Sequence, residues 1–188
     1  MQLRTTWVSL VGLLLGACSD HSTWRPLAET EYTPAQAAQR QKAEAARDAL
    51  AKALLGELTA ALANGPQQAI AVCQERAPVL AAEVAQQHGV RVGRTSLALR
   101  SPRNAPPDWA ADHLRSGPAT AAWFAGSRGE FGAMLPIRLL PQCVQCHGEA
   151  TALSAEVRVE LAKRYPQDRA VGFRPGDLRG YFWVEVPN

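Results

Sequence analysis

Cys143-Val144-Gln145-Cys146-His147 has the C-x-x-C-H spacing at which two thiols bind covalently to the vinyl groups of one haem. The histidine that ends the motif, His147, is then the proximal iron ligand. A structural zinc site would need a second pair of Cys or His ligands, which the sequence lacks. A thioredoxin-like dithiol motif opens a long helix, whereas Gly148 and Thr151 interrupt this one. The motif therefore favours one covalent haem c, with a non-haem metal or dithiol protein as the alternative.

The N-terminal segment is typical of an exported bacterial lipoprotein. Its apolar run, residues 7–15, is too short to span a bilayer as a mature helix. Small residues precede Cys18, as in a lipobox, whose cysteine is diacylated and becomes the mature N-terminus. We predict a signal peptide over residues 1–17, a lipid anchor on Cys18 and a tether over residues 18–33. An ordinary cleaved signal peptide is the alternative.

Location and composition limit the classes of partner. The residue after Cys18 is Ser19 and not Asp, which favours sorting to the outer membrane of a diderm bacterium. On either membrane the protein faces the periplasm, an oxidising compartment in which haem c is attached. The 188 residues include 20 Lys and Arg against 17 Asp and Glu, and one of the arginines lies in the signal peptide. This near balance argues against nucleic acid as a partner. The remaining length suits a single domain, predicted over residues 34–188.

One of the four cysteines has no evident role. The lipid and the motif account for three, which leaves Cys73 without a partner in an exported chain. Ala69, Cys73 and Ala77 recur at every fourth residue, so the thiol lies on the apolar face of a predicted helix. Cys73 is therefore a candidate for the distal iron ligand. The other interpretation is a small buried hydrophobic residue, which is common for free cysteines.

Other residues compete for the distal position. Met134 would give the His/Met coordination of electron carriers, which raises the potential of the iron, whereas a thiolate lowers it. His88 and His113 follow helix or loop ends and are expected to be exposed to solvent. The choice between Cys73 and Met134 stays open on these grounds.

Arginines after the second helix could bind the carboxylates of a haem, because a guanidinium pairs with a carboxylate through two hydrogen bonds. The candidates for propionate contacts are Arg94, Arg100 and Arg103. Asp177 and Arg179 are interpreted as a salt bridge within a turn, without a chemical role.

The first part of the chain has strong helix signals. Thr33-Pro34 is an N-cap followed by proline, and Asn64-Gly65 is a stop, so a helix is predicted over residues 34–63. A second helix is predicted from Pro66 to Gly89, kinked or divided at Pro78. The first helix carries an apolar stripe formed by Leu50, Leu54, Leu58 and Leu62.

After Gly89 the pattern changes to short strands and turns, with two short helices. Strands are predicted at 90–92, 96–99, 123–125, 133–140 and 178–186, and helices at 108–115 and after Ser154. Long helices followed by an antiparallel sheet with flanking helices define an α+β fold. A cytochrome c′-like four-helix bundle is the other architecture, but its motif lies on the last helix, whereas a predicted strand follows His147 here.

Several separated blocks of this sequence, in this order, resemble a known family. The blocks are Val72-Cys73 to Ala77-Pro78, Val92-Gly93-Arg94-Thr95-Ser96-Leu97 to Arg100, Asn104-Ala105-Pro106 with Trp109, Leu135-Pro136-Ile137, Cys143 to Gly148, Tyr165-Pro166-x-Asp168, Ala170-x-Gly172 and Gly176-Asp177-Leu178-Arg179-Gly180. They resemble the c-type haem domain with a PAS-like fold, which occurs in free exported proteins and in extracytoplasmic sensing regions of bacterial signalling proteins. The resemblance covers residues 35–187. It implies a PAS-like sheet flanked by helices, one haem c, and Cys73 opposite His147.

These observations predict an exported, lipid-anchored mono-haem c protein that transfers electrons or senses redox state through an unidentified protein partner. A haem-based sensor of a gas or another small ligand, again acting through a separate partner, is the alternative. An enzyme such as a peroxidase is not favoured, because no acid/base residue is identifiable beside an open iron position.

Overall fold

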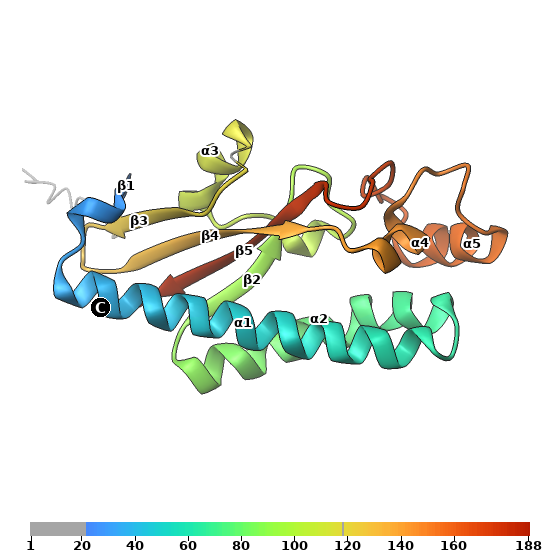
Figure 1. Ribbon diagram of the computed structural model, residues 1–188, viewed down its shortest axis with the longest axis horizontal. Coiled ribbons are helices and arrows are strands. Elements are labelled where there is room, and N and C mark those ends of the chain that lie inside the picture. The colour runs from blue at the N-terminus through green and yellow to red at the C-terminus, as the bar shows by residue number, and fades with distance from the viewer. Residues whose placement is uncertain (1–21, 118) are drawn as a thin grey trace, which may run out of the picture.

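The computed structural model describes residues 22–117 and 119–188, so the predicted signal peptide and Cys18 lie outside the described residues. Helices α1 (Pro34–Leu62) and α2 (Pro66–His88) form a long antiparallel hairpin (Figure 1). The Thr33 hydroxyl accepts a hydrogen bond from the backbone N–H of Gln36, whose side chain accepts one from the N–H of Thr33, so the predicted N-cap is a complete capping box. Both long helices occupy the predicted positions.

A five-stranded antiparallel sheet packs against the hairpin. In sequence order the strands are β1 (Trp24–Pro26), β2 (Arg91–Thr95), β3 (Ala122–Gly126), β4 (Phe131–Arg138) and β5 (Leu178–Val186). Their spatial order is β1-β3-β4-β5-β2, so β2 is an edge strand. The remaining helices are α3 (Asp108–Ser116), α4 (Val144–His147), α5 (Ala155–Arg164), and the 3₁₀ turns η1 (Glu29–Glu31), η2 (Pro102–Asn104) and η3 (Pro141–Cys143). The predicted α+β class is confirmed.

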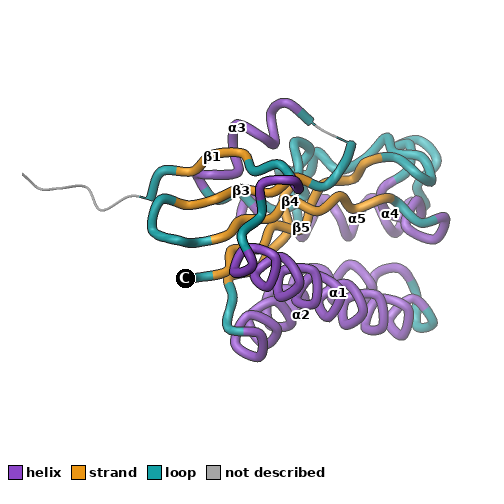
Figure 2. The backbone as a smooth tube through the Cα atoms, turned by 60° about the vertical axis from the view of Figure 1, so that its left-hand side comes forward, coloured by secondary structure: helices purple, strands orange, loops and turns teal. Residues whose placement is uncertain are grey.

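The two faces of the sheet are buried by different helices. On β4, Phe131, Ala133 and Leu135 pack in the core that includes residues of α1 and α2, whereas Met134 packs against α3. This alternation follows from the two-residue period of a strand. Figure 2 shows α1 and α2 side by side along one side of the sheet, with α3 on the other. The helical hairpin extends past the sheet, and there Ile70 of α2 packs against Val157 and Leu161 of α5.

One local prediction is wrong. The segment 96–99 is not a strand, because the Ser96 hydroxyl accepts a hydrogen bond from the N–H of Ala98 (3.0 Å) and donates one to the carbonyl of Arg179 (2.7 Å). These two bonds close a turn directly after β2. Helix α2 continues through Pro78 to His88, so of the two predicted effects of this proline, a kink or a division, the division does not occur.

The predicted tether also needs correction at its C-terminal end. Residues 24–26 form β1, which pairs with β3 at the edge of the sheet. Trp24 stacks on Trp109 with ring centroids 5.0 Å apart, and Leu27 is buried in the main core. Apolar contacts therefore hold this segment on the sheet, and the folded region begins before residue 34. Among the described residues no helix is both long and apolar enough to cross a bilayer.

Gly56 offers a test of how α1 is stabilised. It lies in the interior of α1, and a Cβ added there would meet nothing within 4 Å. Gly56→Ala should raise the free energy of unfolding by about 0.5–1 kcal/mol, because alanine loses less backbone entropy in a helix. Denaturant titration monitored by circular dichroism measures the change. Gly180→Ala is the matched contrast and should destabilise, since its Cβ would overlap the Thr95 carbonyl oxygen. A lower stability for Gly56→Ala would contradict this account.

Candidate functional site

The C-x-x-C-H motif forms a compact turn at the end of β4. The strand leads into η3 and then into α4, which ends at His147. The next residue must be small, because a Cβ on Gly148 would lie 2.6 Å from the Val144 carbonyl oxygen. Cys143 and Cys146 are three residues apart on this turn and are half-buried, and burial raises the pKa of both thiols. Two protonated thiols therefore lie one helical turn apart.

The imidazole of His147 is held by one strong hydrogen bond. Its Nδ1 lies 2.7 Å from the carbonyl oxygen of Ala170. A carbonyl can only accept, so Nδ1 carries the proton and Nε2 keeps its lone pair. The Arg179 Nε atom, 3.3 Å from the same Nδ1, is therefore a close neighbour of the ring and not a donor to it. The arrangement leaves the lone pair of Nε2 available to bind a metal.

Backbone hydrogen bonds fix the carbonyl that orients this histidine. The N–H of Phe173 donates to the His147 carbonyl (2.9 Å), and that of Gly172 donates to Gly148 (2.8 Å). The Asp168 carboxylate accepts from the N–H of Ala170 at 2.7 Å. The segment 170–173 is therefore bonded to His147 and to the adjacent Gly148.

Arg100 joins this segment to the motif from a buried position. Its guanidinium forms an ion pair with Asp168 (3.0 Å), and both side chains are largely buried. It also donates hydrogen bonds to the carbonyls of Cys146 and Ala170. The Ala170 carbonyl thus accepts from Arg100 and from His147. One arginine therefore holds both the motif and the acceptor of its histidine in place.

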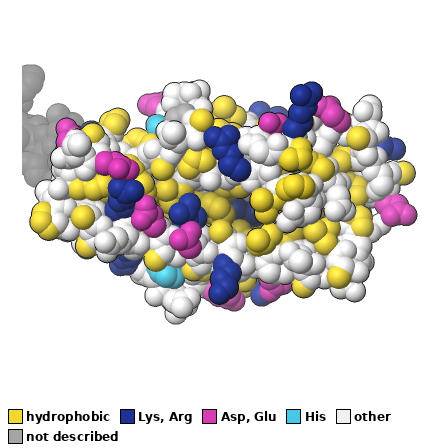
Figure 3. Space-filling view, in the orientation of Figure 1, with side chains coloured by type: hydrophobic (Ala, Val, Ile, Leu, Met, Phe, Trp, Pro, Cys, Tyr) yellow, Lys and Arg dark blue, Asp and Glu magenta, His cyan; other side chains and the backbone are white. Residues whose placement is uncertain are grey.

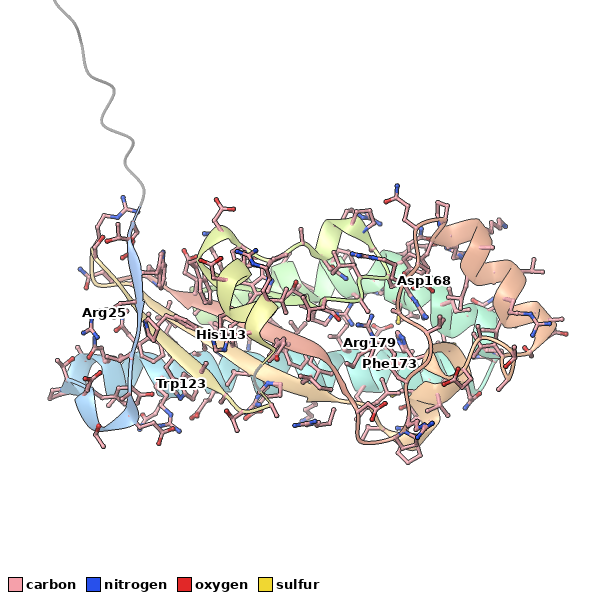
Figure 4. The ribbon with its side chains drawn as sticks, turned by 90° about the horizontal axis from the view of Figure 1, so that it is seen from above. Arg25, His113, Trp123, Asp168, Phe173 and Arg179 are labelled. Carbon is pink, nitrogen blue, oxygen red and sulfur yellow. The ribbon has the colours of Figure 1, made fainter. Side chains whose placement is uncertain are left out.

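The surroundings keep His147 neutral. Its pKa lies well below the usual value, mainly because the ring is buried, and further because the charges of Arg100, Arg179 and Arg94 disfavour a second proton. Burial and the neighbouring arginines also lower the pKa of Arg179 to about 10. Figure 4 shows Arg179, Phe173 and Asp168 grouped in one half of the molecule, and the Arg179 guanidinium lies 5.4 Å from the centre of the Phe173 ring. A neutral imidazole is the form that binds a metal.

A cavity of about 480 Å³ lies beside the motif and is lined by His147 and both of its cysteines. The far wall comes from α1, where Leu54, Leu58 and Leu62 of the predicted stripe line the cavity and are only partly buried. Leu50, the first residue of that stripe, is fully buried under the sheet. Figure 3 shows the corresponding hollow, with apolar side chains, between α1 and β4. We call this space the first cavity.

Cys73 lines the first cavity from α2. It is close enough to Cys143 and Cys146 for its charge to raise the pKa of both thiols. The rival ligand Met134 is excluded by the fold, because it is fully buried in the cluster on the opposite face of the sheet. The structure thus brings together Cys73, the two motif cysteines and His147.

His88 and His113, the other histidines among the described residues, lie away from this site. Neither His88 nor His113 lines the first cavity, and Figure 4 shows His113 in the other half of the molecule. The expectation that His113 is exposed is wrong, since its ring packs edge-on against Phe124 and burial lowers its pKa. In the described part of the chain no three His, Cys, Asp or Glu side chains lie close enough together to hold one metal ion directly, although Cys73, Cys143, Cys146 and His147 line the same cavity.

The arginines separate into two groups. Arg94 and Arg100 line the first cavity, whereas Arg103 does not, and the guanidinium of Arg100 is also bonded within the protein; propionate contacts by any of them stay a prediction. The interpretation of Asp177 and Arg179 as a salt bridge is wrong. Asp177 accepts from the N–H of Arg174 at 2.8 Å, and Arg179 instead donates to the Ala98 carbonyl beside His147. No local pattern reveals that role, although Arg179 stands in one of the family blocks.

Comparisons with known proteins agree with this geometry. The model of the Tll0287-like family matches residues 25–187, which is most of the chain. The chain belongs to the Tll0287-like family. This confirms the resemblance to a c-type haem domain family that the sequence blocks indicated.

A solved structure and the curated proteins complete the comparison. The crystal structure of the cyanobacterial haem protein Tll0287 superposes with a TM-score of 0.58 and 24% sequence identity, over 84% of this chain and 98% of that one. At this identity the likeness establishes a shared fold. No curated protein matches the chain significantly.

Asp168→Asn tests the buried ion pair. The substitution keeps an oxygen for the Ala170 N–H but removes the charge beside Arg100, so the free energy of unfolding should fall by about 3 kcal/mol. Denaturant titration of the protein measures this change in the free energy of unfolding. The control is Asp112→Asn, whose pair with Arg115 is solvent-exposed and contributes little. Equal losses in the free energy of unfolding for the two variants would show that the buried ion pair does not stabilise the site.

Proposed function

We propose that this protein is an exported mono-haem c protein with an electron-transfer or redox-sensing role. Cys143 and Cys146 would hold the haem through thioether bonds, and His147 and Cys73 would bind its iron. The observation that carries the proposal is the hydrogen bond from His147 Nδ1 to the Ala170 carbonyl. Histidines that ligate metals characteristically donate their second ring N–H in this way, which fixes the tautomer and the orientation of the ring.

The residues present fit a haem. The first cavity is apolar along α1 and β4, as the porphyrin faces require, and its volume of about 480 Å³ is in the range of cofactor sites. Leu54, Leu58 and Leu62 present a partly exposed apolar surface to the first cavity, which a bound ligand would cover. A bound haem would supply exchange of one electron at its iron. The chain's own residues would bind it, exclude water and set its ligands.

The family supports the same cofactor. The solved relative is described as a haem protein, and it shares the fold of this chain over almost its whole length. The C-x-x-C-H spacing specifies covalent attachment, which the sequence alone indicates.

Cys73 is the distal ligand that the arrangement favours. It lies on α2, and the motif lies on α4, so the two ligands reach the first cavity from different elements. A thiolate stabilises ferric iron and lowers the reduction potential, which suits a redox sensor better than a high-potential carrier.

The place of work follows from the N-terminal sequence. We propose that Cys18 carries lipid, so that the domain acts on the periplasmic side of a bacterial membrane, with the outer membrane favoured. A protein partner would receive its electrons or its signal.

The covalent haem is tested by a pyridine haemochrome spectrum after acidic acetone extraction, on protein made with a c-type maturation system. We expect one haem c per chain. Cys143→Ser with Cys146→Ser should lose all covalent haem, whereas Cys73→Ala should retain it, because Cys73 forms no thioether. Extraction of all haem from the wild-type chain would overturn the proposal.

The distal ligand is tested by redox titration. Cys73→Ala should change the visible spectrum and raise the midpoint potential by on the order of 0.1 V, because a neutral or absent ligand no longer stabilises ferric iron. Met134→Leu is the matched control and should leave both unchanged, since Met134 packs on the other face of the sheet. An unchanged midpoint potential in Cys73→Ala would show that Cys73 does not bind the iron.

The lipid anchor is tested by fractionation of cells. Cys18→Ser should move the protein from the membrane to the soluble fraction, because a diacylated cysteine is the proposed attachment. The mature domain should remain folded and loaded. Membrane association of Cys18→Ser that survives a salt wash would count against lipidation.

A further inference from the structure

A second cavity of about 420 Å³ lies at the edge of the sheet. Its walls come from α2, from the edge strand β2 and from η2. It adjoins the first cavity, because five residues line both: Cys73, Arg94, Ser101, Asn104 and Tyr165. The two spaces therefore meet at the thiol that we propose as the distal ligand.

The second cavity has an uncompensated positive charge. Arg91, Arg94 and Arg103 line it, and among the described residues no Asp or Glu does. Arg91 is neutralised, since its guanidinium donates to both carboxylate oxygens of Glu185 at 2.9 Å. The excess charge therefore comes from Arg94 and Arg103.

The guanidiniums of Arg94 and Arg103 lack partners. Neither forms a hydrogen bond or an ion pair within residues 22–117 and 119–188. Both act on one group, because the charges of Arg94 and Arg103 each lower the pKa of Tyr165, which burial raises overall to about 12. Two cationic side chains from different elements thus lie near one buried hydroxyl. Arg100, by contrast, has its own carboxylate in Asp168.

Neutral donors border the same space. Asn104 and Tyr165, whose side chains carry an amide and a hydroxyl, both line the second cavity. β2 is an edge strand, so alternate backbone N–H groups point away from β5 on this side of the sheet. An anion in the cavity would find guanidinium, amide and hydroxyl donors together.

We propose that the second cavity binds a small oxyanion from solution, of the phosphate or carboxylate class, between Arg94 and Arg103. Guanidiniums bind such oxygens through paired hydrogen bonds, and the absence of a lining carboxylate leaves both charges available. This site goes beyond the proposed function and does not depend on it. The bound anion lies next to Cys73, so its occupancy and the state of that thiol affect each other reciprocally.

The test is isothermal titration of the haem-loaded protein with inorganic phosphate at constant ionic strength. We expect one saturable site. Arg94→Gln and Arg103→Gln should each weaken binding by about tenfold or more, the loss typical of one charge-assisted hydrogen bond. Arg94→Lys keeps the charge but loses the planar fork, so it should bind with intermediate affinity. Lys52→Gln removes an equal charge from the exposed face of α1 and should leave binding unchanged.

Three results would overturn the proposal. The first is the absence of saturable binding for both probes, phosphate and the carboxylate acetate, up to about 10 mM. The second is an equal loss in Lys52→Gln, which would mean a general effect of charge. The third is unaltered affinity in Arg103→Gln, an exposed position whose substitution leaves the fold intact. If a haem propionate occupied Arg94, phosphate would not bind, but the haemochrome spectrum would still show covalent haem. The anion site would then fail while the proposed function stands.

Discussion

The hydrogen bond between His147 Nδ1 and the Ala170 carbonyl is the constraint on which the site depends. It decides which ring nitrogen is free, and it does so with a backbone group that is itself fixed. The Ala170 peptide is held through its N–H by Asp168 and through its oxygen by Arg100, which also binds the carbonyl of Cys146. The motif and the acceptor of its histidine are therefore parts of one rigid unit, so neither can move without the other.

Local patterns predicted the parts of this protein that local forces determine. The capping box at Thr33, the stop at Gly89 and the N-cap at Ser154 all involve groups within a few residues of one another. The C-x-x-C-H motif was equally recognisable, because its residues are consecutive in the sequence. The strand predicted at 96–99 failed because a hydroxyl that bonds across to Arg179 competes with the strand conformation, and the pattern of apolar residues does not report that partner.

The rest of the site depends on contacts between distant residues. The choice between Cys73 and Met134 could not be made from sequence, because it depends on which face of the sheet each residue reaches. The ion pair between Arg100 and Asp168 joins residues 68 positions apart, and no spacing rule predicts it. The Leu50, Leu54, Leu58 and Leu62 stripe shows the same limit. Its period predicts one apolar face, but the sheet covers only its beginning, and the remainder faces the first cavity.

The placement of Cys73 and His147 in the lining of one cavity has a consequence for the unfolded chain. If both bind one iron, the metal cross-links two residues 74 positions apart, in the way that a disulfide does. A closed loop of this length removes chain entropy from the unfolded state that corresponds to about 4 kcal/mol, as for a disulfide of the same span. The thioether bonds alone close no such loop, because they lie beside His147 in the sequence. Breaking the bond from iron to Cys73 would therefore lower the free energy of unfolding without releasing the haem.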